Sequence, residues 1–367
     1  MNYLSKEEYN QLLNKEDLTE NKKHCINLVI HKIQEVLENH YKVTSNIEKG
    51  CKVVSLDDNY YTLGYNKDDV TLGSRYTKYI DDNTILRTQM TSTIPALLRN
   101  YQNDGDKLYL CPGIVYRRDV RDKTHVGEPH QMDIWYLTNK KQSRKDLLQL
   151  VQLIISIIDK YSGKKTEWRY NETSHHYTDN GIEVEIKYNG SWLEILECGL
   201  ISQKLLDLHN LSNYSGLALG LGLERLVMII KHIDDIRILY DKRDSIQKQL
   251  ENLSKYKAIS NQPSTKRDLS IAINENINEE ELTELILNSV DLNTQSIIES
   301  IKLISETNYN DLPNIAKERL GIQLGQKNIL LRIILRDLIK TLDSKEANDI
   351  YTNIYQKIHC GTNGYWI

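Results

Sequence analysis

Phenylalanine is absent from this chain of 367 residues, although tyrosine occurs 23 times. Typical composition would place on the order of a dozen phenylalanines in a chain of this length. Replacement by tyrosine has a physical cost, because a buried tyrosine hydroxyl needs a hydrogen-bond partner. The absence therefore points to a selective advantage rather than to chance alone.

Paired cysteines and long apolar stretches are also lacking. The five cysteines form no Cys-x-x-Cys pair, which argues against a zinc site and for reduced thiols in a cytosol. They are Cys25, Cys51, Cys111, Cys198 and Cys360. The opening segment MNYLSKEEYNQLLNKEDL has no apolar signal-peptide core, and no run of about 18 apolar residues occurs. We therefore expect a cytoplasmic protein that does not bind a membrane.

The chain also lacks a strong excess of either charge. Its 47 basic and 51 acidic residues give a formal net charge of −4. Such a balance exerts no whole-chain attraction on nucleic acid, so any contact with a polyanion must be local.

The chain is long enough for two domains. A mass of 42.8 kDa exceeds what one hydrophobic core normally organises. We place the first domain at residues 1–240, a linker helix at 241–256 and the second domain at 257–367. Pro263 and Ser264 mark the boundary, because they interrupt a polar helical pattern just before a strand.

The first domain is predicted to be α+β with a mostly antiparallel sheet. Residues 19–40 carry apolar side chains at helical spacing behind Thr19, which predicts a long amphipathic helix. Paired strands are predicted in KLYLCPGIVYRRD and HQMDIWYL, and further strands in GIEVEIKYNG and SWLEILECGLI. We expect the helix in TSTIPALLRNYQN to break near Pro95. Strict β-α-β alternation does not fit this order.

The second domain is predicted to be a ferredoxin-like module. Its order is strand, helix (NEEELTELILNSV), strand (SIIESIKLIS), strand (KNILLRIIL) and helix (SKEANDIYTNIYQKIH). This order is typical of a split β-α-β unit.

The stretch GIVYRRDVRDKTHVGEPHQMDIWYL, residues 113–137, predicts a strand, a charged loop and a returning strand. Arg117, Asp119 and His125 lie in or beside that loop, and Arg225 follows a glycine-rich segment, GLALGLGLERL. Two guanidinium groups can clamp a triphosphate in forked geometry. The glycines at 216, 220 and 222 do not have nucleotide-fingerprint spacing, and taken alone they indicate close backbone packing.

Both segments resemble a known family. Residues 113–137 resemble motif two of the class II aminoacyl-tRNA synthetases in its phenylalanyl-tRNA synthetase form, and GLALGLGLERLVMIIKHIDDIRIL resembles motif three of the same enzymes. Residues 257–367 are similar to that family's ferredoxin-fold anticodon-binding domain, and 19–40 match motif one. The resemblance covers nearly the whole chain, in the single-chain layout of the mitochondrial-type enzyme.

The resemblance implies ATP and Mg²⁺ as cofactors and assigns roles to individual residues. Arg117 and Arg225 are expected to be catalytic, acting on the phosphates of ATP. The expected ATP-binding residues are Arg117, Asp119, His125, Pro129, Glu194, Gly222 and Arg225. The expected amino-acid-binding residues are Gln89, Thr91, Gln131, Asp133, His175, Tyr177 and Ala218. The metal ligands remain unknown.

Several positions depart from the family pattern. Pro129 replaces a phenylalanine that stacks on adenine, while His175 and Tyr177 replace two phenylalanines of the amino-acid pocket. Gln89 and Thr91 stand at the amino-group positions in the segment TQMTS. In addition, Glu197 replaces a glycine, and phenylalanines are replaced by Tyr116, Leu217 and Leu219. These changes leave the ATP chemistry plausible and the identity of the amino acid open.

We predict an enzyme that charges tRNA with phenylalanine or a related aromatic amino acid through an aminoacyl-adenylate. The expected partners are this amino acid and tRNA, phenylalanine tRNA in particular, and the protein is expected to be a monomer or a homodimer. Two alternatives are a ligase acting on a non-tRNA acceptor and a non-catalytic amino-acid sensor. Because a ribosome can finish this chain when phenylalanyl-tRNA is exhausted, we also consider a backup or resistance synthetase.

Overall fold

The computed structural model describes residues 3–102, 105–118, 122–258, 262–337 and 339–364. The chain divides into two compact units. The first unit is Met1–Arg117 with Glu128–Lys257, and the second is Arg118–Gly127 with Ala258–Ile367.

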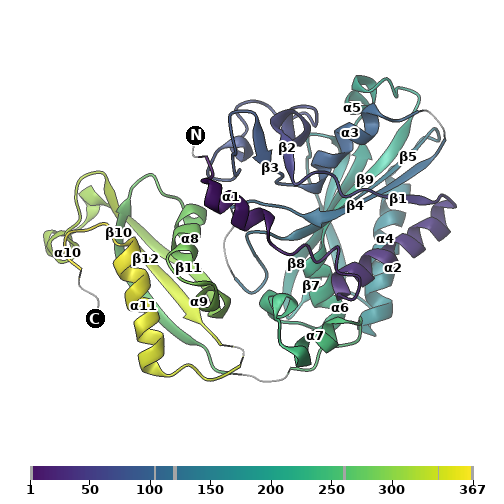
Figure 1. The fold of residues 1–367 in the computed structure, drawn as a ribbon. Coiled ribbons are helices and arrows are strands. Elements are labelled where there is room, and N and C mark those ends of the chain that lie inside the picture. Colours follow the sequence, from purple (N-terminus) through teal and green to yellow (C-terminus); the bar gives the residue numbers. More distant parts are fainter. Residues whose placement is uncertain (1–2, 103–104, 119–121, 259–261, 338, 365–367) are drawn as a thin grey trace. The chain divides into compact units, whose positions relative to one another are not determined.

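A seven-stranded sheet organises the first unit, in the order β1-β4-β5-β9-β8-β7-β6 (Figure 1). Only the pair β1 and β4 is parallel among these described strands. The bounds are β1 Ser45–Ile47, β4 Lys107–Ile114, β5 His130–Thr138, β6 Trp168–Glu172, β7 Thr178–Tyr188, β8 Ser191–Ile201 and β9 Ser215–Gly222; β2 Val53–Ser55 and β3 Thr84–Leu86 form a separate pair. The predicted α+β class and the pairing of β4 with β5 are confirmed.

The long hairpin of β7 and β8 depends on its turn. Tyr188 pairs with Ser191 across a two-residue connection. Asn189 and Gly190 fill it with φ values of 48° and 85°. Positive φ at both central residues is the requirement of the hairpin turn that matches strand twist. The turn thereby fixes which residues of β8 lie beside β7.

Helices cover one face of this sheet. Helices α2 (Cys25–Tyr41), α4 (Arg144–Ser162) and α6 (Leu223–Lys231) contact one another. Helix α2 also contacts β4, α4 contacts β8, and α6 contacts both β5 and β9. Met132, Ile134, Leu219 and Leu221 alternate along β5 and β9 and are buried. The helices of the unit are α1 Lys6–Leu13, α2 Cys25–Tyr41, α3 Ile94–Arg99, α4 Arg144–Ser162, α5 Gln203–Leu208, α6 Leu223–Lys231 and α7 Asp244–Leu250. The residues between these apolar positions point to the other face.

Two helix boundaries differ from the prediction. Helix α2 begins at Cys25 because His24, not Thr19, caps it: His24 Nδ1 accepts the Ile26 amide at 3.2 Å. Helix α3 begins at Ile94, and Pro95 lies in its first turn rather than at a break. Proline is tolerated there because the first-turn amides have no partner within the helix.

A buried lysine of α6 binds backbone carbonyls at and just after the end of α7. Lys231 is fully buried, and its Nζ donates to the carbonyls of Gln249, Asn252 and Ser254 at 2.7–2.8 Å. These contacts satisfy carbonyl groups that the end of a helix leaves unpaired. Helix α7 therefore covers only part of residues 241–256.

A three-stranded antiparallel sheet organises the second unit, with β12 between β10 and β11. The predicted split β-α-β order is confirmed by this arrangement. The elements are β10 Thr265–Asn274, α8 Glu279–Asn288, α9 Leu292–Ile297, β11 Ile298–Asn308, α10 Asn314–Leu320, β12 Gln326–Leu335 and α11 Ser344–Ile358. Alternate residues of β12, from Ile329 to Leu335, form a core of this unit with Tyr351 and Ile354 of α11.

Candidate functional site

Three strands of the first unit place their polar and small residues in rows on the face opposite helices α2, α4 and α6. Asp133 of β5 lies opposite Gly220 of β9, which lies opposite Glu197 of β8. The neighbouring row contains Trp135, Ala218 and Gly199. Residues directly opposite one another in antiparallel strands point to the same face. The predicted residues Asp133 and Ala218 therefore lie on one face.

Asp133 is the most deeply buried acid of this face, with 3% of its surface exposed. Its Oδ2 accepts hydrogen bonds from Thr91 Oγ1 at 2.7 Å and from Trp135 Nε1 at 3.3 Å. Burial nevertheless raises the pKa of Asp133 to about 6. A carboxylate in such surroundings gains strongly from a cationic ligand.

The two predicted glutamines have different surroundings. Gln89 precedes the short 3-10 helix Met90–Thr93, and its Nε2 donates to the Asn59 carbonyl at 2.8 Å. Gln131 lies two residues before Asp133 on β5, opposite Gly222, and so shares the face of Asp133. Thr91 thus contacts Asp133 directly, and Gln131 lies on the same face of β5 as Asp133.

Three rings stand in a row behind Asp133. The rings of Trp135 and Tyr177 are stacked with centroids 5.9 Å apart, and those of Tyr177 and His175 with centroids 6.1 Å apart. Burial raises the pKa of Tyr177 well above its ordinary value. We call Trp135, Tyr177 and His175 the aromatic row. Two of its members, His175 and Tyr177, are predicted pocket residues.

His175 connects the aromatic row to Glu197. His175 Nε2 lies 3.2 Å from Glu197 Oε2, and the contact with His175 lowers the pKa of Glu197. A Cβ on Gly181 would lie 2.8 Å from His175 Nδ1. Gly181 therefore leaves the space that the imidazole occupies.

The predicted phosphate-binding arginines lie on the same side of the sheet. Arg225 Nη1 donates to the Glu194 carbonyl at 2.9 Å and lies 3.7 Å from its carboxylate. Burial raises the pKa of Glu194, whereas the charges of Arg225 and Arg117 oppose that rise. Arg117 is half-buried, and its charge also lowers the pKa of Glu197. Both arginines therefore act electrostatically on the acids of β8.

Gly222 leaves room beside Arg225. It is the residue before α6, and a Cβ there would meet only Arg225 Cδ, at 4.0 Å.

Pro129, also a predicted ATP-binding residue, precedes β5, and its carbonyl accepts the Val115 amide at 2.9 Å. This hydrogen bond continues the pairing of β4 and β5 beyond their ends.

Two predicted residues of the charged loop are not placed with this group. Asp119 lies outside the described residues. His125 belongs to the segment Arg118–Gly127 of the second unit, where its Nδ1 lies 2.8 Å from the Asp122 carboxylate. The roles of Asp119 and His125 in ATP binding remain predictions.

Sequence reasoning missed a buried network at the start of β5. Glu224 Oε1 lies 2.6 Å from His130 Nδ1 and accepts the His130 backbone amide at 2.8 Å and the Tyr240 hydroxyl at 2.6 Å. Because the Leu18 amide donates to His130 Nε2 at 2.9 Å, the imidazole proton lies on Nδ1. The available signal was Glu224, the one acid of helix α6. This network fixes the strand that carries Gln131 and Asp133.

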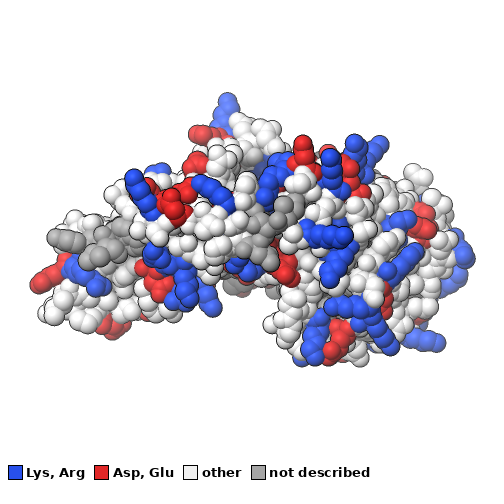
Figure 2. Space-filling view, turned by 90° about the horizontal axis from the view of Figure 1, so that it is seen from below, with Lys and Arg blue, Asp and Glu red and all other residues white. Residues whose placement is uncertain are grey.

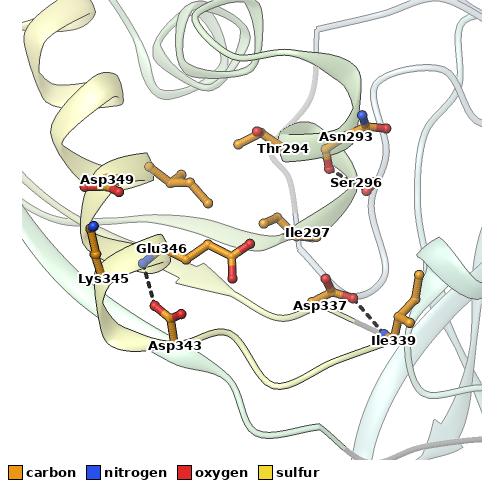
Figure 3. Close-up of a pocket in the computed structure, with 11 residues that line it drawn as sticks. Asn293, Thr294, Ser296, Ile297, Asp337, Ile339, Asp343, Lys345, Glu346 and Asp349 are labelled. Carbon is orange, nitrogen blue, oxygen red and sulfur yellow. Dashed lines mark hydrogen bonds between the residues drawn. The ribbon is translucent and has the colours of Figure 1, made fainter.

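A separate hollow of about 610 Å³ lies in the second unit (Figure 3). It lies between α9, the segment after β12 and the start of α11, and none of the predicted site residues lines it. The lining residues are Asn293, Thr294, Ser296, Ile297, Asp337, Ile339, Asp343, Lys345, Glu346, Asp349 and Ile350. Asp343 accepts the Glu346 amide as the cap of α11, so part of its polarity is structural.

The described part of the chain has neither a metal-binding cluster nor a membrane-spanning helix. No group of three or more His, Cys, Asp or Glu side chains there is arranged to hold a metal ion. None of the helices described has both the length and the apolar character needed to cross a bilayer.

Comparison with known proteins gives a consistent result. Residues 8–250 match the family described as "tRNA synthetases class II core domain (F)". The chloroplastic/mitochondrial phenylalanine–tRNA ligase of Arabidopsis thaliana is 27% identical over 348 residues, which cover 92% of this chain and 76% of that protein. The mitochondrial phenylalanine–tRNA ligase of Saccharomyces cerevisiae is 24% identical over 413 residues, covering 90% and 84%.

An alpha subunit also matches, over a shorter range. The phenylalanine–tRNA ligase alpha subunit of Acetivibrio thermocellus is 31% identical over 245 residues, covering 62% of this chain and 69% of that subunit. The single-chain mitochondrial proteins match much more of this chain, as the sequence motifs predicted. The chain belongs to the class II tRNA synthetase core family, in its (F) group.

Proposed function

We propose that this protein activates phenylalanine or a closely related aromatic amino acid with ATP and transfers it to tRNA. The observation that carries this proposal is the position of Asp133, a buried carboxylate beside Thr91 and Gln131, on the face that also holds Arg225 and Glu194. The relatives named above are phenylalanine–tRNA ligases. An ammonium site beside a phosphate site is what amino-acid activation requires.

The first step joins two anions and needs charge compensation more than an acid or a base. The amino-acid carboxylate attacks the α-phosphorus of ATP, forming the aminoacyl-adenylate, and pyrophosphate leaves. Arg117 is assigned to the charge that develops on the α-phosphate, and Arg225 to the outer phosphates and one face of adenine. Glycine at 222 leaves backbone open beside the nucleotide.

Magnesium is proposed to enter with the nucleotide. Mg²⁺ is usually held by one or two carboxylates together with substrate phosphates, and bound there it neutralises phosphate charge. Glu194 is the acid beside Arg225 and so fits that role.

The second unit is proposed to contact tRNA. Lys266 is exposed at the start of β10, and Arg267 follows it. Figure 2 shows many basic side chains interspersed with acidic ones over the face displayed. Local basic groups of this kind supply phosphate contacts even when the net charge of the chain is negative.

Charging of total tRNA tests the proposal. Purified protein, ATP and labelled phenylalanine should give acid-precipitable aminoacyl-tRNA. Adenylate formation without charging of any tRNA would favour a ligase for another acceptor, and absence of both would favour an amino-acid sensor.

A specific observation favours a second, more detailed role. Because the chain contains no phenylalanine, its synthesis does not consume phenylalanyl-tRNA. We propose that it acts as a backup or resistance synthetase when the housekeeping enzyme is inhibited. Under such an inhibitor, synthesis of this protein should persist and its expression should protect cells. Equal sensitivity with and without it would exclude the backup role and leave the ligase activity untouched.

Location and assembly follow as further proposals. All five cysteines are free thiols, three of them buried, which suits a reducing compartment such as the cytoplasm. Cell fractionation tests this, since the relatives compared above include chloroplastic and mitochondrial proteins. Light scattering would decide between a monomer and a homodimer.

A further inference from the structure

Gly220 leaves open space for a Cβ on the face described above, and we call this space the slot. A Cβ at this position would meet a single neighbour, Asp133 Oδ1, at 3.5 Å. Asp133 of β5 bounds the slot on one side and Glu197 of β8 on the other, both directly opposite Gly220. Trp135 of the aromatic row lies opposite Ala218, in the neighbouring row. Two acidic residues therefore flank the slot on the same face of the sheet.

One oxygen of the buried acid is available to a ligand. Thr91 and Trp135 both donate to Oδ2 of Asp133. The described residues provide no hydrogen bond to Oδ1, the atom that a Cβ on Gly220 would meet. A ligand that donates a hydrogen bond to Oδ1 would add to the two hydrogen bonds that Oδ2 already accepts.

The negative charge of the slot is only partly compensated. Glu197 raises the pKa of Asp133, which means that the two carboxylates interact. His175 lies 3.2 Å from Glu197, while the Asp133 side chain contacts only neutral donors. A cation between the two acids would relieve their repulsion.

We propose that Glu197 is a second ammonium-binding residue, holding the substrate α-ammonium over Gly220 together with Asp133, with His175 as the residue that positions Glu197. This inference rests on the proposed function and adds a ligand to it. Adjacent strands are about 4.8 Å apart, so the Cα atoms of Asp133 and Glu197 are about 10 Å apart. Two leaning carboxylates reach one ammonium across that span.

The number of hydrogen-bond acceptors on this face also fits an ammonium group. The group has three N–H donors in a tetrahedral arrangement. Asp133 Oδ1, a Glu197 oxygen and the side-chain carbonyl of Gln131 are three acceptors on the same face.

The decisive experiment compares two ligands by calorimetry. One is the non-hydrolysable adenylate analogue phenylalaninyl-AMP, which retains the α-ammonium, and the other is its deamino counterpart. Each is titrated into the full-length wild type, Glu197→Gln and Glu183→Gln. Glu183 is the matched control, because it lies opposite Glu197 on β7, one strand further from the slot.

We expect Glu197→Gln to weaken binding of the ammonium-bearing ligand at least tenfold and binding of the deamino ligand less than twofold. Glu183→Gln should change the affinity for either ligand less than twofold. Equal weakening of both ligands by Glu197→Gln, or no weakening, would overturn the role of Glu197 while leaving the ligase function in place. Failure of the wild type to bind either ligand would contradict the proposed function itself.

A glycine substitution supplies an independent readout. Gly220→Ala should fold normally, because its Cβ would make one ordinary contact. It should also lose selectivity for the ammonium-bearing ligand, since the methyl group fills the floor of the slot. An unchanged affinity ratio of the two ligands in a folded Gly220→Ala protein would place the ammonium elsewhere.

Discussion

Glu224 of α6 holds His130 of β5 through two atoms, because its Oε1 lies 2.6 Å from the imidazole Nδ1 and 2.8 Å from the backbone amide nitrogen. The same carboxylate accepts the Tyr240 hydroxyl, and Glu224 is 2% exposed. The strand that carries Asp133 is thereby fixed to the helix that carries Arg225. Two parts of the candidate site thus depend on one buried acid.

Glu224→Ala is expected to destabilise the protein by on the order of 3 kcal/mol, because several buried donors lose their acceptor. Thermal unfolding measures this. Glu172→Ala is the control, since that side chain is 71% exposed and should have little effect. A Glu224→Ala protein as stable as the control would mean that the network does not support the fold.

Arg117→Ala should abolish adenylate formation, because the guanidinium is assigned to charge that appears only in the transition state. ATP–pyrophosphate exchange measures the loss. Arg169→Ala, which removes an exposed arginine paired with Glu185, is the matched control. Exchange by Arg117→Ala within about tenfold of wild type, roughly 1.4 kcal/mol of barrier, would contradict the assignment.

Asp133→Asn should stabilise the folded protein at neutral pH while impairing amino-acid binding. The pKa of Asp133 is raised from 3.8 to about 6 by burial, which corresponds to roughly 3 kcal/mol when the group is ionised. The folded state holds the proton more tightly than the unfolded state. Wild-type stability therefore falls as pH rises from about 4 to 6, and the variant lacks this fall.

Denaturant unfolding of wild type and Asp133→Asn at several pH values tests this sign. The stability advantage of the variant should grow between pH 4 and 6 and stay constant above that. A constant difference across the range would show that Asp133 does not titrate in this window. Binding of the amino acid by wild type should strengthen over the same range.

Removal of residues 258–367 should spare adenylate formation and impair tRNA charging. The second unit has its own hydrophobic core, and the predicted activation residues Arg117, Asp133 and Arg225 lie in the first. Exchange and charging assays on the truncated protein separate the two steps. Charging at the full-length rate would contradict the proposed role of the second unit in binding tRNA.

Tyr177→Phe and His175→Phe should shift selectivity toward plain phenylalanine. Polar groups in a side-chain pocket favour a hydroxylated aromatic, and a group left unpaired costs about 1–3 kcal/mol. The ratio of kcat/KM for tyrosine, ring-hydroxylated isomers and phenylalanine measures the shift. A wild type that already strongly prefers plain phenylalanine would refute the effect of these two residues.

Much of the fold was predictable because its signals are local. Alternation along HQMDIWYL and SWLEILECGLI, and the Asn189–Gly190 turn, indicate strands and a hairpin within a few residues. The start of α2 was not predictable, because the ring of its capping residue, His24, contacts the Leu239 carbonyl, 215 residues away in the chain. Such contacts leave no periodic pattern in the sequence.

The candidate site was predictable in its motif residues and not in its cross-strand partners. Arg117, Asp133 and Arg225 stand in recognisable segments. The pairing of Glu197 with His175 and the row of Asp133, Gly220 and Glu197 depend on strand register, which the hydrophobic pattern of one strand cannot fix relative to another. The sequence alone therefore shows Glu197 only as a departure from the family pattern.

ATP–pyrophosphate exchange with each of the twenty amino acids in turn tests the central claim most directly. The account predicts exchange with phenylalanine or another aromatic amino acid, dependent on Arg117 and Asp133. Exchange with no amino acid, or with equal rates for wild type and Arg117→Ala, would contradict it.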